Sequence, residues 1–387
     1  MDFELSPEHQ ELQKVVRRMA QDHVQPRARE LDSSGEYPED TFRLFADAGL
    51  LACAIPEEYG GNGAGALGLV LAIEEVAKYC NASALILLLS RLPTSPIIIA
   101  GTDDQKRRYV QTTATGERRG AFTLSEPHAG SDVAGQTTRA EPDGDGYRIT
   151  GTKSWISGGT VADWYLVFAR TDLEAGHDGF GAFIVEAEEP GVSVGSIDKK
   201  LGVRGVPTCE IVYDGAWVPK ENIVALGRDG FKNAMFALNS MRPIVGARGI
   251  GLAEGALMYA TEYVKDRPAF GQTIADFQGI QWMIANLAAE IEACRLLTYR
   301  AAMMVDHGQH DIQHMGQLSM AKYRATELAV RAASECLQML GAAGYTEDHP
   351  LELYYRDSKQ LTIVEGTSQV QQNLIAKAVI GHDLWWD

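Results

Sequence analysis

Two changes in residue pattern along the chain most constrain what it can fold into. Residues 1–118 and 231–387 carry apolar residues at helical spacing, whereas residues 119–230 form short apolar runs separated by turn residues. The clearest seam, with steps of three and four, consists of Phe277, Ile280, Ile284, Leu287, Ile291 and Cys294. The sequence therefore predicts an α+β protein with three domains: an N-terminal helical domain (1–118), a central β-barrel or sandwich (119–230) and a C-terminal four-helix bundle (231–387).

The same patterns locate the individual elements. Ser6 and Pro7 predict a helix start, because serine caps a helix and proline suits its first turn. Helices are expected near 6–31, 38–49, 66–79, 104–116, 231–265, 275–306, 311–341 and 366–380, with a buried helix around 84–89. Strands are expected at 121–124, 147–150, 153–157, 164–170, 182–185, 192–195 and 209–213. Residues 143–146 and 214–215 have the composition of tight turns.

Charge and composition exclude several classes of protein. The 52 acidic residues outnumber the 35 basic ones and give a net charge of −17, which disfavours a nucleic-acid binder. The apolar run at 84–89 is far too short to span a bilayer, and the N-terminus lacks a targeting pattern, so a cytoplasmic protein is expected. The five cysteines form no CxxC pair, and the histidines at 307, 310 and 314 fit an exposed loop, so no metal site is predicted.

Two segments of the central region carry residues suited to a ligand. Residues 124–132 read LSEPHAGSD, a strand running into a turn that offers hydroxyls, backbone N–H groups and a glycine. Residues 152–159 read TKSWISGG, in which a tryptophan could stack on a flat ring beside a hydroxyl. A hydroxyl-capped loop and a core tryptophan are the alternative interpretations from the residues alone.

Together with three later segments, these motifs resemble those of the acyl-CoA dehydrogenases, a flavoprotein family with helical, β-barrel and helical-bundle domains. The later segments are DRPAFG at 266–271 followed by Gln278, QMLGAAGY at 338–345, and YRD at 355–357 followed by VEGTSQ at 364–369. The resemblance extends from about residue 3 to the end. The sequence departs from the family at Ser125 and Ser157, where threonine is common, at His128, which replaces a small residue, and at Ala342, which replaces a glycine.

The resemblance implies FAD as the cofactor and a set of residues that contact it. The contacts expected within one subunit and near the flavin ring are Phe122, Leu124, Ser125, Gly130, Ser131, Trp155 and Ser157. Arg267, Phe270 and Gln278 are expected to hold the dinucleotide of a neighbouring subunit. Gln338, Gly341, Thr367 and Gln369 are expected to complete the cofactor site.

For the reaction, the resemblance implies α,β-dehydrogenation of an acyl-CoA thioester to the trans-2-enoyl-CoA. Glu365 is expected to remove the α-proton, and flavin N5 to accept the β-hydrogen as hydride. Some branches place the base just before the bundle arginine; here Met241 occupies that position and cannot serve. Residues expected at the substrate are Ser131, Arg242, Val364, Gly366, Leu85, Leu88 and Arg91.

The sequence constrains the identity of the substrate and of the partners less than that of the cofactor and the reaction. Val364 is small, which makes α-branched or cyclic acyl groups conceivable, and Arg91 could pair a distal carboxylate, face solvent or meet an internal acid. The family further implies a homotetramer built as a pair of dimers, and electron-transfer flavoprotein as the acceptor. Alternatives on the same fold are a carrier-protein thioester as substrate, an oxygen-using oxidase or monooxygenase, and an inactive scaffold.

Overall fold

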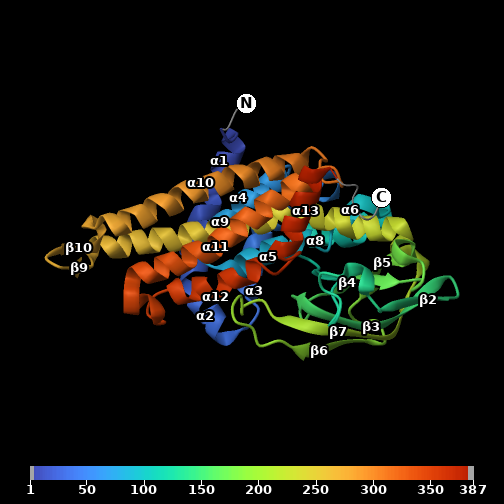
Figure 1. The fold of residues 1–387 in the computed structure, drawn as a ribbon. Coiled ribbons are helices and arrows are strands. Elements are labelled where there is room, and N and C mark those ends of the chain that lie inside the picture. The colour runs from blue at the N-terminus through green and yellow to red at the C-terminus, as the bar shows by residue number, and fades with distance from the viewer. Residues whose placement is uncertain (1–3, 382–387) are drawn as a thin grey trace.

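The computed structural model describes residues 4–381, so the part of the expected N-terminal pattern at 1–3 lies outside the described residues. Long helices run side by side through the molecule, and the β domain lies against one end of them (Figure 1). The short β9–β10 ribbon lies at the opposite end (Figure 1). The order of helical, β and helical domains predicted from the sequence is confirmed, while the boundaries at 118/119 and 230/231 remain predictions.

The N-terminal domain is built of short helices around two buried ones. Its helices are α1 (Pro7–Met19), α2 (Ala28–Ser34), α3 (Glu39–Asp47), α4 (Gly65–Ala77), α5 (Asn81–Arg91), α6 (Ser95–Ala100), α7 (Asp103–Gln105) and α8 (Thr112–Ala114), with π-helical stretches η1 (Ala20–Val24) and η5 (Lys106–Gln111) and 3₁₀ turns η2 (Gln25–Arg27), η3 (Leu50–Ala52) and η4 (Glu57–Tyr59). The Ser6 hydroxyl accepts a hydrogen bond from the backbone N–H of His9 and caps α1, which is the start that Ser6 and Pro7 predict. Nearly every residue of α4 and α5 is buried.

One stretch of the described chain, Asn81–Ala100, is long and apolar enough to cross a membrane by length and composition. Of its apolar window, 83% is buried among the other elements of the fold. Its apolar residues therefore contribute to the core, where α5 and α6 pack against α9.

The central domain is an eight-stranded mixed sheet that folds over on itself. Its elements are β1 (Gly120–Thr123), η6 (Val133–Gly135), β2 (Arg139–Asp143), β3 (Gly146–Ser157), β4 (Trp164–Arg170), η7 (Gly176–Gly179), β5 (Phe180–Glu186), β6 (Val192–Ile197), β7 (Thr208–Val218), η8 (Lys220–Asn222) and β8 (Ile223–Leu226). The strand order is β6-β7-β3-β2-β4-β5-β8, and β1 pairs with β4 in parallel. All seven residues of β4 are buried, because one face meets β7 and β3 while the other meets the helical domain.

The predicted turns have different outcomes. The turn at 143–146 is confirmed, since Asp143 pairs with Gly146 where β2 meets β3. The turn predicted at 214–215 is wrong: both residues lie within β7, and Gly215, with φ of +68°, is the extra residue of a bulge opposite Thr150. Strands β2 and β8 were not expected, because their sequences, RAEPD and IVAL, show no alternation long enough to stand out.

The C-terminal domain consists of long helices that pack side by side. Its elements are α9 (Arg228–Asp266), β9 (Pro268–Ala269), β10 (Gln272–Thr273), η9 (Ile274–Asp276), α10 (Gln278–Asp306), α11 (Met315–Leu340), η10 (Gly341–Tyr345), α12 (Leu351–Leu361) and α13 (Ser368–Ile380). Leu287, Ile291 and Cys294 of the predicted seam are buried between α10 and its neighbours. Helix α12 was not expected, and it carries the chain from the end of α11 back to the loop before α13.

Candidate active site

The loop between α12 and α13 has an unusual backbone. Glu365 has φ of +52° and Gly366 has φ of +87°, so two consecutive residues adopt the left-handed region. A Cβ on Gly366 would lie 2.8 Å from Nε2 of Gln371, so glycine is required there both for conformation and for space. Thr367 then caps α13 by accepting a hydrogen bond from the N–H of Val370.

Two fully buried side chains hold this loop. Nζ of Lys322, on α11, donates a hydrogen bond of 2.8 Å to the Gly366 carbonyl. Nε2 of Gln371, on α13, donates to the carbonyls of Glu365, at 3.2 Å, and Gly366, at 3.1 Å. Both carbonyls that the left-handed turn exposes are therefore satisfied from neighbouring helices.

The charges of three buried cations, Arg242, Arg248 and Lys322, act on the Glu365 side chain. Nη1 of Arg242 donates to the Met315 carbonyl at 2.9 Å and to Oγ of Ser319 at 2.8 Å, so this arginine is held by neutral partners. Arg248 donates to Oε1 of Gln360 at 2.9 Å and to the side chain of Asn81. Burial lowers the pKa of Arg242 to about 9, that of Arg248 to about 10 and that of Lys322 to about 8.

The Glu365 carboxyl group is the acid that these cations face. Burial raises its pKa to about 7, against the lowering effect of Arg248, Lys322 and Arg242. Its Oε2 atom is buried and has no hydrogen-bond partner among the described residues. An unpaired carboxylate whose pKa lies near neutrality is suited to take a proton from a bound molecule.

A second buried charge pair shapes the turn after β1. Nζ of Lys153 donates to Oε1 of Glu126 at 2.9 Å, to the Leu124 carbonyl at 3.0 Å and to Oε1 of Gln136 at 3.0 Å. Both charged side chains are almost completely buried. The pair therefore ties the LSEPHAGSD segment to β3, where the Ser154 N–H also donates to the Ser125 carbonyl.

Trp155 on β3 has an unusual backbone conformation. It has φ of +61° and lies where the pairing of β3 with β7 shifts register between Lys153 and Ile156. The bulge turns the indole outward, and the residue is 54% exposed. Within residues 4–381, five non-glycine residues have positive φ, and three of them, Trp155, Phe270 and Glu365, are predicted functional residues. Such strained conformations cluster at functional sites.

The remaining predicted flavin contacts of the central domain lie around Trp155. Phe122 is half-buried on β1 and packs on Phe168, while Leu124 is 7% exposed. Ser125 and Ser157 are half-buried, and Gly130 and Ser131 are exposed on the turn. An exposed indole, open serines and a glycine at which a Cβ would meet nothing within 4 Å fit a flat heterocycle such as flavin.

Another group of predicted cofactor contacts lies far from this surface. Arg267, Phe270 and Gln278 are exposed on and beside the β9–β10 ribbon, at the end of the molecule opposite the sheet (Figure 1). Phe270 is 96% exposed. Gln338 is exposed on the last turn of α11, and Gly341 caps that helix with φ of +61°. Gln369 does not belong to this group, because it is exposed on α13 shortly after Glu365. One protomer therefore does not bring Arg267 and Trp155 together.

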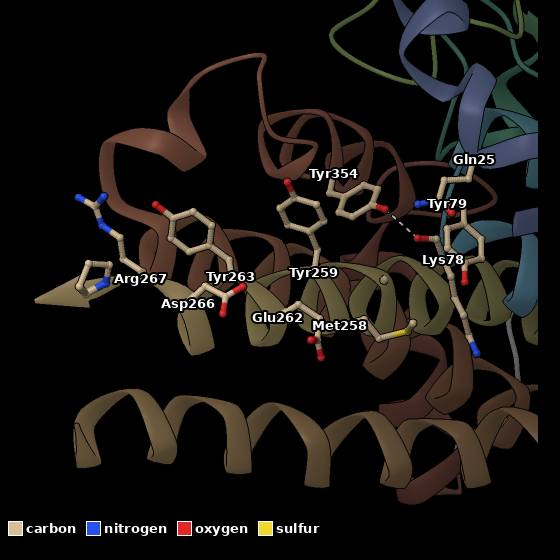
Figure 2. A pocket seen from close by; sticks show the side chains of 12 residues that line it. Gln25, Lys78, Tyr79, Met258, Tyr259, Glu262, Tyr263, Asp266, Arg267 and Tyr354 are labelled. Atoms are coloured by element: carbon tan, nitrogen blue, oxygen red, sulfur yellow. Dashed lines mark hydrogen bonds between the residues drawn. The ribbon is translucent and has the colours of Figure 1, made fainter. Parts of the chain in front are cut away.

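An open groove of about 570 Å³ runs along the second half of α9 toward this ribbon. Figure 2 shows its tyrosines, Tyr79, Tyr259, Tyr263 and Tyr354, with Arg267 at one end. Neither Glu365 nor its three cations line the groove. The groove is therefore separate from the Glu365 loop.

The residues predicted at the acyl group take two kinds of position. Leu85 and Leu88 are buried in α5, and Val364 and Gly366 are half-buried beside Glu365. Arg91 is 9% exposed, so it does not face solvent, and its Nη1 has no hydrogen-bond partner among the described residues. Burial lowers its pKa to about 10, and Asp306 is the acid that attracts it from a distance.

Sequence reasoning missed Lys322, Arg248 and Gln371, which are completely buried around the loop that carries Glu365. The available signal was a charged residue at a core position: Lys322 follows the buried Ala321 and shares a helix face with the buried Ala325 and Ala329. Within residues 4–381, no group of three or more histidine, cysteine or acidic side chains is placed to hold a metal.

Comparisons with known proteins agree with this architecture. Residues 6–117, 121–216 and 228–380 match the N-terminal, middle and C-terminal domains of acyl-CoA dehydrogenases. A probable acyl-CoA dehydrogenase, fadE25 of Mycobacterium leprae, is 38% identical over 98% of this chain and 97% of its own length.

Two solved structures are similar over almost the whole chain. Butyryl-CoA dehydrogenase from Megasphaera elsdenii has a TM-score of 0.95 and 35% identity, covering 98% of this chain and 100% of that one. A chain solved in work on the electron transferring flavoprotein of Acidaminococcus fermentans has a TM-score of 0.96 and 37% identity, covering 99% and 100%. The protein therefore belongs to the acyl-CoA dehydrogenase family and is an oxidoreductase of that class.

Proposed function

We propose that the protein is an FAD-dependent acyl-CoA dehydrogenase that converts an acyl-CoA thioester to the trans-2-enoyl-CoA, with Glu365 as the base. The observation that carries the proposal is the Glu365 carboxyl group, buried, without a hydrogen bond to Oε2 and with its pKa raised to about 7. A proton α to a thioester carbonyl is weakly acidic, so its removal needs a base that is not already neutralised by an ion pair.

The residues around Glu365 have separate tasks in this proposal. The left-handed backbone at residues 365–366 holds Glu365 in the loop between α12 and α13, where its N–H would donate to the thioester oxygen. Bound FAD would supply the acceptor for the β-hydrogen, which leaves as hydride. Leu85 and Leu88 would contact the acyl chain and exclude water, and Val364 leaves room for a branched or cyclic group.

FAD would be held by two protomers. The flavin surface of one protomer would consist of Trp155, Phe122, Leu124, Ser125, Ser157, Gly130 and Ser131. Thr367 and Gln369 of the same protomer follow Glu365 in the sequence. Arg267, Phe270, Gln278, Gln338 and Gly341 would contact the dinucleotide of a neighbour, because the β9–β10 ribbon cannot reach its own sheet (Figure 1). We therefore propose a homotetramer of paired dimers. A protein that is monomeric by light scattering while it retains full flavin would contradict this assembly.

The decisive experiment mixes the purified yellow protein anaerobically with a panel of straight, branched, cyclic and dicarboxylic acyl-CoA thioesters. Loss of flavin absorbance with formation of the 2-enoyl thioester supports the proposal and identifies the acyl group. A protein that stays colourless after reconstitution with FAD, or a flavin that no thioester in the panel reduces, would overturn it.

The electron acceptor separates this function from an oxidase on the same fold. We propose electron-transfer flavoprotein as the acceptor, and one similar chain comes from work on such a protein. Reoxidation should be fast with that partner and slow with oxygen. Stoichiometric peroxide at the full turnover rate would identify an oxidase instead.

A further inference from the structure

Lys322 is a buried cation that forms no ion pair with the residues the structure describes. Its side chain is completely buried in α11, and its one recorded hydrogen bond goes to the neutral Gly366 carbonyl. Two other buried lysines differ: Lys153 lies 2.9 Å from Glu126, and Lys78 lies 3.0 Å from Glu75. Because a buried charge is costly unless it is paired, the position of Lys322 needs a reason other than stability.

We propose that Lys322 is a positioning residue for Glu365, which fixes the direction of the carboxylate through Gly366 and favours its ionised form by charge. The inference rests on the proposed role of Glu365 as the base. It assigns to the lysine a task in which it touches neither substrate nor cofactor.

The positioning part follows from the hydrogen bonds of the loop. The Gly366 carbonyl accepts from Lys322 and from Gln371, and the Glu365 carbonyl accepts from Gln371 alone. The two donors come from different helices, α11 and α13, and converge on one peptide. Their convergence fixes the Gly366–Thr367 peptide, and Gln371 also holds the Glu365–Gly366 peptide before it. Lys322 therefore acts on the direction of the Glu365 side chain through the left-handed turn at residues 365–366.

The effect of Lys322 on the ionisation of Glu365 follows from the charges of the groups around the loop. Gln371 carries no charge, so of the two donors only Lys322 favours the anionic form of Glu365. The other cations facing Glu365 are Arg242 and Arg248, both from α9. Burial raises the pKa of Glu365, and the cations lower it. Without the Lys322 charge, two cations instead of three oppose the effect of burial.

Other charged groups also act on Lys322 and the two arginines. Lys322 is attracted by Glu365 and Glu327 and repelled by Arg242. Glu327 accepts a hydrogen bond from Oγ of Ser368, and Asp357 of α12 attracts Arg248. Glu365 is thus the acid that faces all three buried cations in common, and Glu327 and Asp357 each have another partner.

The test titrates Glu365 directly in the flavin-loaded enzyme without acyl-CoA. The protonated-carboxyl infrared band that E365Q abolishes reports its protonation. We expect a midpoint near pH 7 in the native protein and an upward shift of about one unit or more in K322M. K322R, which keeps the charge, should restore the native midpoint. K78M, which removes a buried lysine from the Glu75 ion pair, should leave the midpoint unchanged.

Kinetics give a second readout. The pH profile of flavin reduction in K322M should move up with the infrared midpoint. For a shift of one unit, kcat at pH 7 should fall about fivefold, with KM for acyl-CoA nearly unchanged. A midpoint in K322M that equals the native one would overturn the proposal. K322Q, which is smaller and neutral, replaces K322M if the latter does not fold, with the same expected shift. Because the infrared titration needs no turnover, it tests Lys322 even where the acyl-CoA panel refutes the proposed function.

Discussion

Glu126 and Glu365 are both buried acids beside a buried lysine, yet the structure gives them opposite properties. The Glu126 carboxylate accepts hydrogen bonds from the N–H groups of Thr137 and Thr138, from Oγ1 of Thr137 and from Lys153. The Glu365 carboxylate accepts none from the described residues at Oε2, and Lys322 binds the neighbouring backbone instead.

The difference in hydrogen bonding decides the protonation of each acid. Burial acts to raise both pKa values, but the charge of Lys153 and the direct hydrogen bonds outweigh it at Glu126 and lower that pKa to about 2. At Glu365, three cations without a direct bond do not outweigh burial, and the pKa rises to about 7. A buried glutamate beside a lysine is therefore a fixed anion when donors reach the carboxylate and a usable base when they reach only the backbone.

Replacing Glu365, the proposed base, should have the largest effect. E365Q keeps the size of the side chain and removes its basicity, so we expect a loss of at least about 10³-fold in the rate of flavin reduction. FAD content and acyl-CoA binding should remain, because the amide preserves the shape of the loop. Rapid mixing under saturating acyl-CoA measures this rate. Reduction within tenfold of the native rate would place the base elsewhere and end the comparison.

Replacing the fixed anion should act on stability instead. E126Q leaves the Lys153 ammonium buried without a counter-charge, which costs about 3–5 kcal/mol of unfolding free energy. Urea unfolding measures this cost, and flavin release should occur at lower denaturant because the LSEPHAGSD turn depends on the pair. The double variant E126Q/K153M, which removes both charges, should recover part of the loss. A loss below about 1 kcal/mol in E126Q would show that the pair is not structurally required.

The sequence predicts more of the fold than of the difference between Glu126 and Glu365. The long apolar periodicity of α10 and the short runs of β3 and β4 sufficed for the three domains, since burial patterns determine both. The bulge at Gly215 and the strand β8 escaped prediction because they depend on pairing partners far away in the sequence. Glu365 was found by resemblance, whereas Lys322 and Arg248 were not, since their burial depends on how α9 and α11 pack.

The two acids should also give stability opposite dependences on pH. The folded pKa of Glu365 is raised to about 7, so its contribution is present below about pH 4.5 and is lost as the pH rises through 7. The folded pKa of Glu126 is lowered, so its contribution is present above about pH 4.5 and is lost as the pH falls through about 2.

The E365Q variant should therefore lose about 2 kcal/mol less stability than the native protein between pH 5 and pH 8. The figure allows for the fact that Glu365 as a whole is half-buried, although its carboxyl group is buried. Asp357, whose pKa burial also raises to about 7, contributes equally to both proteins and cancels in the comparison. Urea unfolding at several pH values provides the measurement. Parallel curves for the two proteins would mean that Glu365 does not titrate in this range.

The smallest effect is expected from His128, which lies in the LSEPHAGSD segment at a position where a small residue is common in the family. Its Nε2 lies 3.5 Å from Oε2 of Glu126 and 3.3 Å from Oγ1 of Thr137, but its side chain is 55% exposed. The carboxylate already accepts four hydrogen bonds from Thr137, Thr138 and Lys153, so the histidine adds a weak contact at the solvent edge. Exposed pairs of this kind contribute about 0–1 kcal/mol.

The H128A variant should consequently change the unfolding free energy by less than about 0.5 kcal/mol. It should also leave FAD affinity within about twofold. Urea unfolding and flavin titration measure these two quantities. A loss comparable to that of E126Q would show that His128, and not the buried donors, holds Glu126 as an anion.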